Sequence, residues 1–304
     1  MINKFIIIGE ARSGTTSLNE IFNNGLYNPK NKEVRPTLAE PFNVLFKKFD
    51  EWDNGRYVYN YVHGENGFFS RLPERTRDYI NPIRSGTFCI TSHAETPQYV
   101  FDDVIDLSFK DNYGIKELTR GKFFCEKLLK ASNRYGYKYI HLVRQNLLAM
   151  AISFSLSRQH QVWNIPPSWP KAKERKESQV NKVKNFPIEP LDIKDLEAHV
   201  TRLTQRKKIF EEKKNENWIT VYFKNLYSHD HDERYDQFSK ISDFLNIDFR
   251  LKTFTKNVDH HDLIDLFFGE SKRTTQDYVY DKIPNLKEIL SHFNYTKEQL
   301  TERI

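Results

Sequence analysis

One stretch near the start of the chain constrains the fold more than any other: residues 4–18, KFIIIGEARSGTTSL. Its apolar run at residues 5–8 is typical of a short strand that is buried on both faces. Gly9 and Gly14 bound a tight turn, after which apolar residues recur at helical spacing. Such a turn directs consecutive backbone N–H groups and the positive end of a helix dipole at one point. The stretch therefore predicts a strand–turn–helix unit that binds a phosphate or sulfate group.

The residue after the second glycine indicates which anion suits this loop. Gly9 and Gly14 have the spacing of a P-loop, but nucleotide-hydrolysing enzymes follow the second glycine with a lysine that grips the terminal phosphates. Here Thr15 occupies that position, and Arg12 is the only cation between the two glycines. The missing lysine argues against hydrolysis of a nucleoside triphosphate and for a different anion. The alternative is an ordinary strand–helix turn whose serine and threonine side chains cap the helix.

A second constellation follows an apolar segment farther along the chain. Residues 137–143 predict another buried strand, and Arg144 ends it. An NTPase ends the corresponding strand in an aspartate that holds magnesium, so a second NTPase feature is missing. The helix predicted after Arg144 carries Ser153 and Ser155. A guanidinium group and a hydroxyl group on the flank of a helix are suited to bind a phosphate, although an ordinary amphipathic helix after a strand has the same outline.

Two segments resemble the sulfotransferases that use 3′-phosphoadenosine-5′-phosphosulfate (PAPS), in particular the bacterial branch of trehalose and nodulation-factor sulfotransferases. They are ARSGTTSL at residues 11–18 and HLVRQNLLAMAISFSLSRQHQVWN at residues 141–164. The resemblance implies an α/β fold of the P-loop-like, three-layer type, with a central parallel sheet and helices on both faces. It also implies PAPS as the sulfuryl donor, the bisphosphate PAP as the product, and no required metal.

The resemblance also assigns parts of the cofactor to particular residues. Arg144 and Ser153 would hold the 3′-phosphate, while a basic pair near the C-terminus, Lys272 and Arg273, resembles the segment that closes over it. Ser153 lies one position farther from Arg144 than in many members of the family, so Ser155 is an alternative. The 5′-phosphosulfate would be held by the loop residues Arg12, Ser13, Gly14, Thr15, Thr16 and Ser17, and Arg12 would also stabilise charge on the leaving phosphate.

Four residues are candidates for the acceptor side of the site. Glu40 precedes a proline, which leaves it extended, and it resembles the acidic residue that this branch places beside the acceptor hydroxyl. It is the candidate general base, with a surface glutamate before a turn as the alternative. His93 follows a predicted strand and is either another base or a structural histidine. Lys116 lies in a further predicted strand and faces the sulfuryl group or solvent, and Trp163 is a candidate wall of the acceptor cleft.

Length, charge and the lack of long apolar runs limit the number of domains, the kind of ligand and the location of the protein. The 304 residues are enough for one large α/β domain or two small ones, and we expect one sulfotransferase-like domain over residues 1–304. Residues 164–190, rich in proline and basic side chains, predict a loop or flap within it. A net charge of +6 permits an anionic ligand without requiring nucleic acid. Since no apolar run reaches the ~20 residues of a membrane span and the first is too short for a signal peptide, a cytoplasmic location is expected.

These observations lead to one hypothesis with two alternatives. The hypothesis is the transfer of a sulfuryl group from PAPS to a hydroxyl acceptor by in-line displacement, and the resemblance alone suggests a carbohydrate or glycolipid as the acceptor. One alternative is a P-loop kinase that uses ATP and depends on magnesium. The other is a non-catalytic nucleotide-binding or nucleic-acid-binding protein, whose affinity for nucleic acid would fall steeply with salt. The expected partner is a hydroxyl-bearing small molecule or glycan, and an oligomer is compatible with the sequence.

Overall fold

The computed structural model describes residues 3–25, 37–39, 42, 69–84, 96–119, 122–160, 187–228, 230–246 and 277–300. Within these ranges, five strands form a sheet in the order β2-β3-β1-β4-β5. All neighbouring pairs are parallel, so every strand ends at the same edge of the sheet. The strands are β1 Phe5–Gly9, β2 Thr37–Ala39, β3 Gly114–Leu118, β4 Lys138–Val143 and β5 Trp218–Tyr222.

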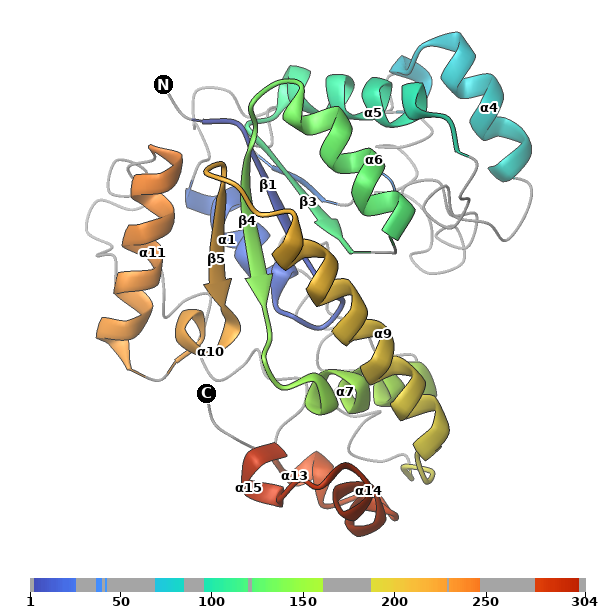
Figure 1. Cartoon of the computed structure of the whole chain (residues 1–304), viewed down its shortest axis with the longest axis vertical. Coiled ribbons are helices and arrows are strands. Elements are labelled where there is room, and N and C mark those ends of the chain that lie inside the picture. Colours follow the sequence, from blue (N-terminus) through green and yellow to red (C-terminus); the bar gives the residue numbers. More distant parts are fainter. Residues whose placement is uncertain are drawn as a thin grey trace.

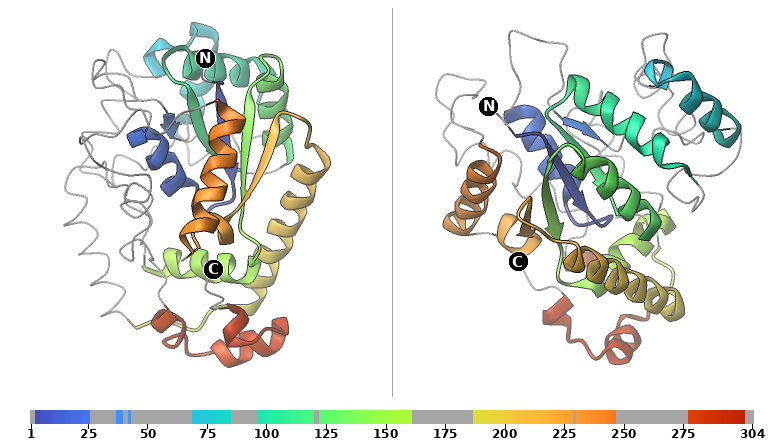
Figure 2. Two further views of the ribbon diagram at one scale, coloured as in Figure 1. Left: turned by 90° about the vertical axis from the view of Figure 1, so that its left-hand side faces the viewer. Right: turned by 45° about the horizontal axis from the view of Figure 1, so that its top comes forward.

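The sheet lies between two layers of helices (Figure 1; Figure 2). Successive side chains of a strand point to opposite faces, and β1 supplies both layers. Phe5 and Ile7 pack against the layer of α1 and α11, whereas Ile6 and Ile8 pack against that of α5 and α6. One layer consists of α1 Thr15–Gly25, α10 Phe223–Leu226 and α11 His231–Leu245, and the other of α4 Glu74–Arg84, α5 Gln98–Asp111, α6 Lys122–Asn133 and α9 Ile193–Glu212.

A third apolar cluster lies beyond the carboxyl edge of the sheet. It joins α7, which follows β4, to the first turns of α9 and to the C-terminal helices (Figure 1). Ile152 of α7 and Ile289 of α14 are both fully buried there. The C-terminal segment is therefore packed close to the edge at which β1 and β4 end. The helices of this part are α7 Leu147–His160, α13 Asp277–Tyr280, α14 Leu286–Phe293 and α15 Lys297–Leu300, while a short helix, η1 Phe69–Arg71, precedes α4.

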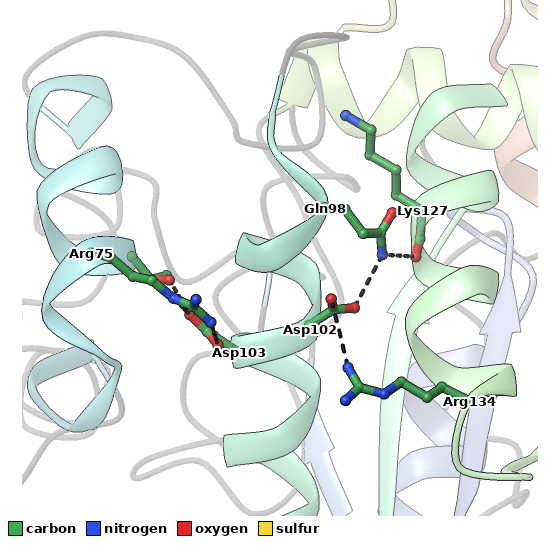
Figure 3. A network of polar contacts seen from close by, with 7 residues as sticks. Arg75, Gln98, Asp102, Asp103, Lys127 and Arg134 are labelled. Carbon is green, nitrogen blue, oxygen red and sulfur yellow. Dashed lines mark hydrogen bonds and ion pairs between the residues drawn. The ribbon is translucent and has the colours of Figure 1, made fainter.

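Polar contacts attach α4 and α6 to α5 on the outer side of the sheet (Figure 3). The buried carboxylate of Asp103 accepts two hydrogen bonds from Arg75, at 3.0 Å from Nε and 2.7 Å from Nη2, and a third from the Thr76 hydroxyl. On the α6 side, Gln98 Nε2 donates to the carbonyl oxygen of Lys127 at 3.0 Å. These contacts hold the layer together at a distance from the strand ends.

The predicted α/β fold, with a central parallel sheet and helices on both faces, is confirmed. The strand β5 ends at Tyr222, because Phe223 already begins α10. The helix α9 begins at Ile193, after Asp192 caps it by accepting hydrogen bonds from the N–H groups of Lys194 and Asp195. The sequence patterns did not predict α5 or β2. No helix in the described ranges is long and apolar enough to cross a membrane.

Some predictions fall outside the described residues. They are the strand predicted over residues 87–92 and nearly all of the predicted flap, of which only residues 187–190 are described. The expectation of one domain over residues 1–304 stays a prediction.

Candidate functional site

The loop after β1 is a tight turn with two residues in the left-handed region. Arg12 has φ of 69° and Gly14 has φ of 86°. The Ser13 N–H and the Ser13 hydroxyl both donate to the carbonyl oxygen of Glu10, at 3.1 Å and 2.6 Å. Left-handed backbone is costly for a residue with a side chain, and it occurs preferentially at functional sites. The turn directs the Arg12 side chain towards α7 instead of towards solvent, as its contact with that helix shows.

Within the described ranges, a row of backbone N–H groups in the loop has no backbone acceptor. The N–H groups of residues 14–17 donate to no backbone carbonyl of the described chain, while the N–H of Leu18 donates to the Gly14 carbonyl at 3.1 Å. Unpaired N–H groups are expected in the first turn of a helix, where they and the helix dipole favour an anion. The predicted strand–turn–helix unit is thus present, with its donors available at the end of β1.

Two aromatic rings from α10 pack against Gly14. A Cβ atom at this position would lie 2.7 Å from Cε2 of Tyr227 and 2.9 Å from Cε2 of Phe223. The Tyr227 hydroxyl donates to the Gly14 carbonyl at 2.6 Å, and burial raises the pKa of Tyr227, so the phenol stays protonated. Glycine is needed here both for the backbone conformation and for the close approach of the rings.

The two predicted motifs meet at Arg12. Its Nε donates to the Ser153 hydroxyl at 3.1 Å, and Nη1 of Arg144 donates to the Arg12 carbonyl at 3.3 Å. These contacts join residues that are 141 and 132 positions apart in the sequence. Burial, and next the neighbouring charge of Arg144, lower the pKa of Arg12 to about 10. Two guanidinium groups are therefore brought together at the start of α1.

The guanidinium group of Arg144 lacks part of its hydrogen bonding in the described chain. Its Nε atom is buried and has no hydrogen-bond partner in the structure, and its guanidinium lies over the ring of Phe223, 4.9 Å from the centroid. Burial lowers the pKa of Arg144, while the nearby Tyr280 hydroxyl acts in the opposite direction. No carboxylate of the described chain forms an ion pair with Arg144. A buried cation without an acidic partner is costly, and an anionic ligand would offset that cost.

A carboxylate occupies the other side of the loop. Glu10 Oε2 lies 3.0 Å from Nη1 of Arg206 on α9, and the same nitrogen donates to the Thr119 carbonyl at 3.2 Å. Burial raises the pKa of Glu10, and Arg206 counteracts the effect. The N–H of Thr119 donates to the Gly9 carbonyl at 2.9 Å, which extends the pairing of β1 and β3 past the strand ends. The ion pair therefore anchors the first residue of the loop to α9.

The other predicted site residues are distributed as follows. Ser153 is 3% exposed and contacts Arg12, which favours it over Ser155 as a member of the site. Lys116 is 2% exposed, so its interpretation as a surface lysine is wrong. In the register of the sheet it lies beside Ile7, whose side chain faces the α1 layer. The remaining predicted residues lie outside the described ranges: Glu40, His93, Trp163, Lys272 and Arg273.

Five residues of the site were not predicted from the sequence. For Glu10 the sequence did offer a signal, because it is an acidic residue directly after the glycine that ends a buried strand. The other four had no local signal, because each reaches the loop from an element that is distant in the sequence. They are Arg206 on α9, Phe223 and Tyr227 on α10, and Tyr280 on α13.

Comparison with known proteins adds a structural likeness. No family model matches the chain, and no curated protein matches it. Among solved structures, the chain is similar to a sulfotransferase domain from the curacin biosynthetic pathway, with 14% sequence identity and a TM-score of 0.40; the match covers 97% of this chain and 99% of that one. A likeness of this extent identifies neither family nor activity, so a function must be argued from the residues of the site.

Proposed function

We propose that the chain is a sulfotransferase that transfers a sulfuryl group from PAPS to a hydroxyl acceptor by in-line displacement. One observation carries the proposal: Arg12 and Arg144 meet at the loop after β1, where Arg144 donates to the Arg12 carbonyl and Arg12 donates to the Ser153 hydroxyl. Two neighbouring cations disfavour each other's charged state. Bound anionic groups of the cofactor would reverse that effect and supply the missing partner of Arg144.

The donors of the site fit the two charged ends of PAPS. The N–H groups of residues 14–17 and the Arg12 guanidinium would hold the 5′-phosphosulfate, while Arg144 and Ser153 would hold the 3′-phosphate. PAPS, when bound, supplies a sulfuryl group that is activated by its phosphate leaving group. Fixed donors directed at that phosphate stabilise the charge that develops on it. The buried, unpaired Nε of Arg144 supports a second anionic group in addition to the one at the loop.

On the acceptor side, we propose Glu40 as the general base that takes the proton of the acceptor hydroxyl. A positioned base of this kind typically contributes a factor of ~10²–10⁴ to the rate. The acceptor is proposed to be a carbohydrate or glycolipid, on the basis of the family resemblance of the two motifs.

A calorimetric titration without metal tests the cofactor assignment. PAP should bind the protein more tightly than 5′-AMP, which lacks the 3′-phosphate, and Arg144→Ala should abolish this preference by removing a charge-assisted contact. Arg134→Ala is the matched control, because Arg134 is an exposed arginine on the outer helical layer. Equal binding of PAP and 5′-AMP to the unmodified protein would refute the proposal, and preferential binding of ATP with magnesium would favour a kinase.

A further inference from the structure

A group of cationic side chains lies between α7 and α9, next to the candidate cofactor site. Arg158 comes from the last turns of α7. Arg202 and Arg206 come from α9, where they follow His199 by three and seven residues and lie on the same side of the helix. We call these four residues the basic strip. The two helices cross and contact each other (Figure 1), and the rings of Phe154 and His199 are 4.6 Å apart with their planes at 76°. Since Arg158 follows Phe154 by four residues, it lies on the same side of α7, near His199.

The three arginines of the strip surround a neutral histidine with positive charge. Burial, and next the charges of Arg202, Arg206 and Arg158, lower the pKa of His199 to about 4. Arg206 is the one arginine of the strip with an ion pair among the described residues, and that pair is with Glu10. Arg158 and Arg202 are exposed and form no ion pair within the described chain.

The arrangement works against the stability of the fold. Arg202 and Arg206 are four residues apart on one helix, a spacing at which like charges destabilise the helix. His199, between cations on both helices, is held in its neutral form. Proteins tolerate such destabilising arrangements of charge mainly at functional sites. A ligand that brings negative charge to Arg158 and Arg202 would remove the repulsion.

The strip touches the loop after β1 through Arg206, and its neighbour Phe154 lies beside a residue that contacts the loop. Arg206 bonds Glu10, the first residue after the glycine that ends β1. On α7, Phe154 directly follows Ser153, which accepts the hydrogen bond of Arg12. From Arg206 to His199 the strip extends along α9 by roughly 10 Å, because a helix rises about 1.5 Å per residue. A molecule that presents a hydroxyl group at the loop could therefore place a second group against Arg202 and Arg158.

We propose that the basic strip binds an anionic group of the acceptor, so that the preferred acceptor is an acidic saccharide bearing carboxylate, sulfate or phosphate groups. The inference rests on the proposed sulfotransferase function, whose acceptor it makes more specific. A saccharide fits better than a nucleic acid, because the strip is short and, within the described ranges, the aromatic ring that contacts it, that of Phe154, packs against His199 instead of offering an open stacking surface. Arginine forks favour such anions because they form two parallel hydrogen bonds to them.

The test uses fluorescence anisotropy with a fluorescein-labelled dextran sulfate oligosaccharide, in the presence of saturating PAP. Unsulfated dextran of equal length is the neutral comparison. The double variant Arg158→Gln/Arg202→Gln should weaken binding of the sulfated probe by about tenfold or more, since two charge-assisted contacts are lost. Lys194→Gln/Lys208→Gln is the matched control, because it removes two exposed positive charges of α9 that lie outside the face that carries the strip. This control variant should bind the sulfated probe with an affinity within about twofold of that of the unmodified protein.

Three other outcomes would overturn the inference about the strip. Equal losses in the two double variants would mean that the probe responds to overall charge. Tighter binding of a single-stranded DNA of equal charge, lost in the strip variant, would indicate a nucleic-acid site. Weaker PAP binding in the strip variant would assign the strip to the cofactor. A lack of preference for PAP over 5′-AMP, with the sulfated probe still binding through the strip, would instead refute the sulfotransferase proposal.

Discussion

Replacement of Gly14 by alanine tests the architecture of the loop most directly. The residue has φ of 86°, and a Cβ atom would lie 2.7 Å from a ring atom of Tyr227 and 2.9 Å from one of Phe223. A left-handed backbone costs alanine about 1–2 kcal/mol, of which about 0.4–1 kcal/mol is returned because alanine restricts the unfolded chain. Displacement of two packed rings adds about 1–3 kcal/mol. We therefore expect Gly14→Ala to lower the free energy of unfolding by about 2–4 kcal/mol.

Gly136 provides the matched control for this change. It also has positive φ, 66°, but an added Cβ would meet no atom within 4 Å. Gly136→Ala therefore carries only the backbone cost, a net loss of about 1 kcal/mol or less. The difference between the two variants in urea unfolding measures the contact between the loop and the α10 rings.

The same pair of variants separates binding from stability. Gly14→Ala should also weaken PAP binding in calorimetry, because a shifted Tyr227 no longer holds the Gly14 carbonyl and the adjacent N–H groups lose their alignment. Gly136→Ala should bind PAP normally. If both variants lost equal stability and bound PAP equally well, then α10 would not be packed against the loop and the account of the site would be wrong.

Three further predictions follow from other parts of the chain. Glu40→Gln should reduce turnover by roughly 10²–10⁴ with PAP affinity unchanged in calorimetry, because it removes the proposed base; near-normal turnover would exclude that role. Asp103→Ala should cost about 1–3 kcal/mol in urea unfolding, since it leaves a buried threonine hydroxyl without its acceptor. Asp102→Ala, which breaks a 4.0 Å ion pair with the exposed Arg134 and a hydrogen bond from Gln98, should cost only about 0–1 kcal/mol. Burial lowers the pKa of His141 and His199 to about 4 from the ordinary value of 6.5. Because the unfolded chain binds more protons between these values, stability should fall as the pH drops from 6.5 towards 4, by up to about 1.4 kcal/mol per unit for each histidine. His199→Gln should remove about half of that slope, and an unchanged slope would show that the imidazole is not held neutral by its surroundings.

The central elements of the fold could be predicted because their patterns are local. The apolar residues 5–8 predict a strand buried on both faces, and all four side chains are fully buried between the two helical layers. The same reasoning located β4 and α7. In contrast, β2 has only three residues, so tertiary packing defines it. The helix α5 begins directly after Pro97, a local signal that was visible in the sequence.

The candidate site likewise has features that local sequence predicts and others that only the tertiary structure shows. The spacing of Gly9 and Gly14, together with the absent lysine and aspartate, was enough to predict an anion site of an unusual type. Sequence alone also singled out Arg12, Arg144 and Ser153. Sequence could not show that Arg12 contacts both Arg144 and Ser153. Contacts across more than a hundred residues depend on how β1 and β4 are ordered in the sheet.

Lys116 shows why exposure could not be read from local pattern. A lysine in a short strand is compatible with a solvated face, but β3 lies between β1 and β2 and is covered by helices, so the side chain is buried. Sequence by itself determined the strand–turn–helix unit, its glycines and the types of charged residue near it, since these depend on backbone conformation and on side-chain spacing along a single element. Only the tertiary structure decided that Tyr227, Tyr280 and Arg206 complete the site and that the basic strip lies beside it, because those side chains come from elements that meet only when the parallel sheet brings its strand ends to one edge.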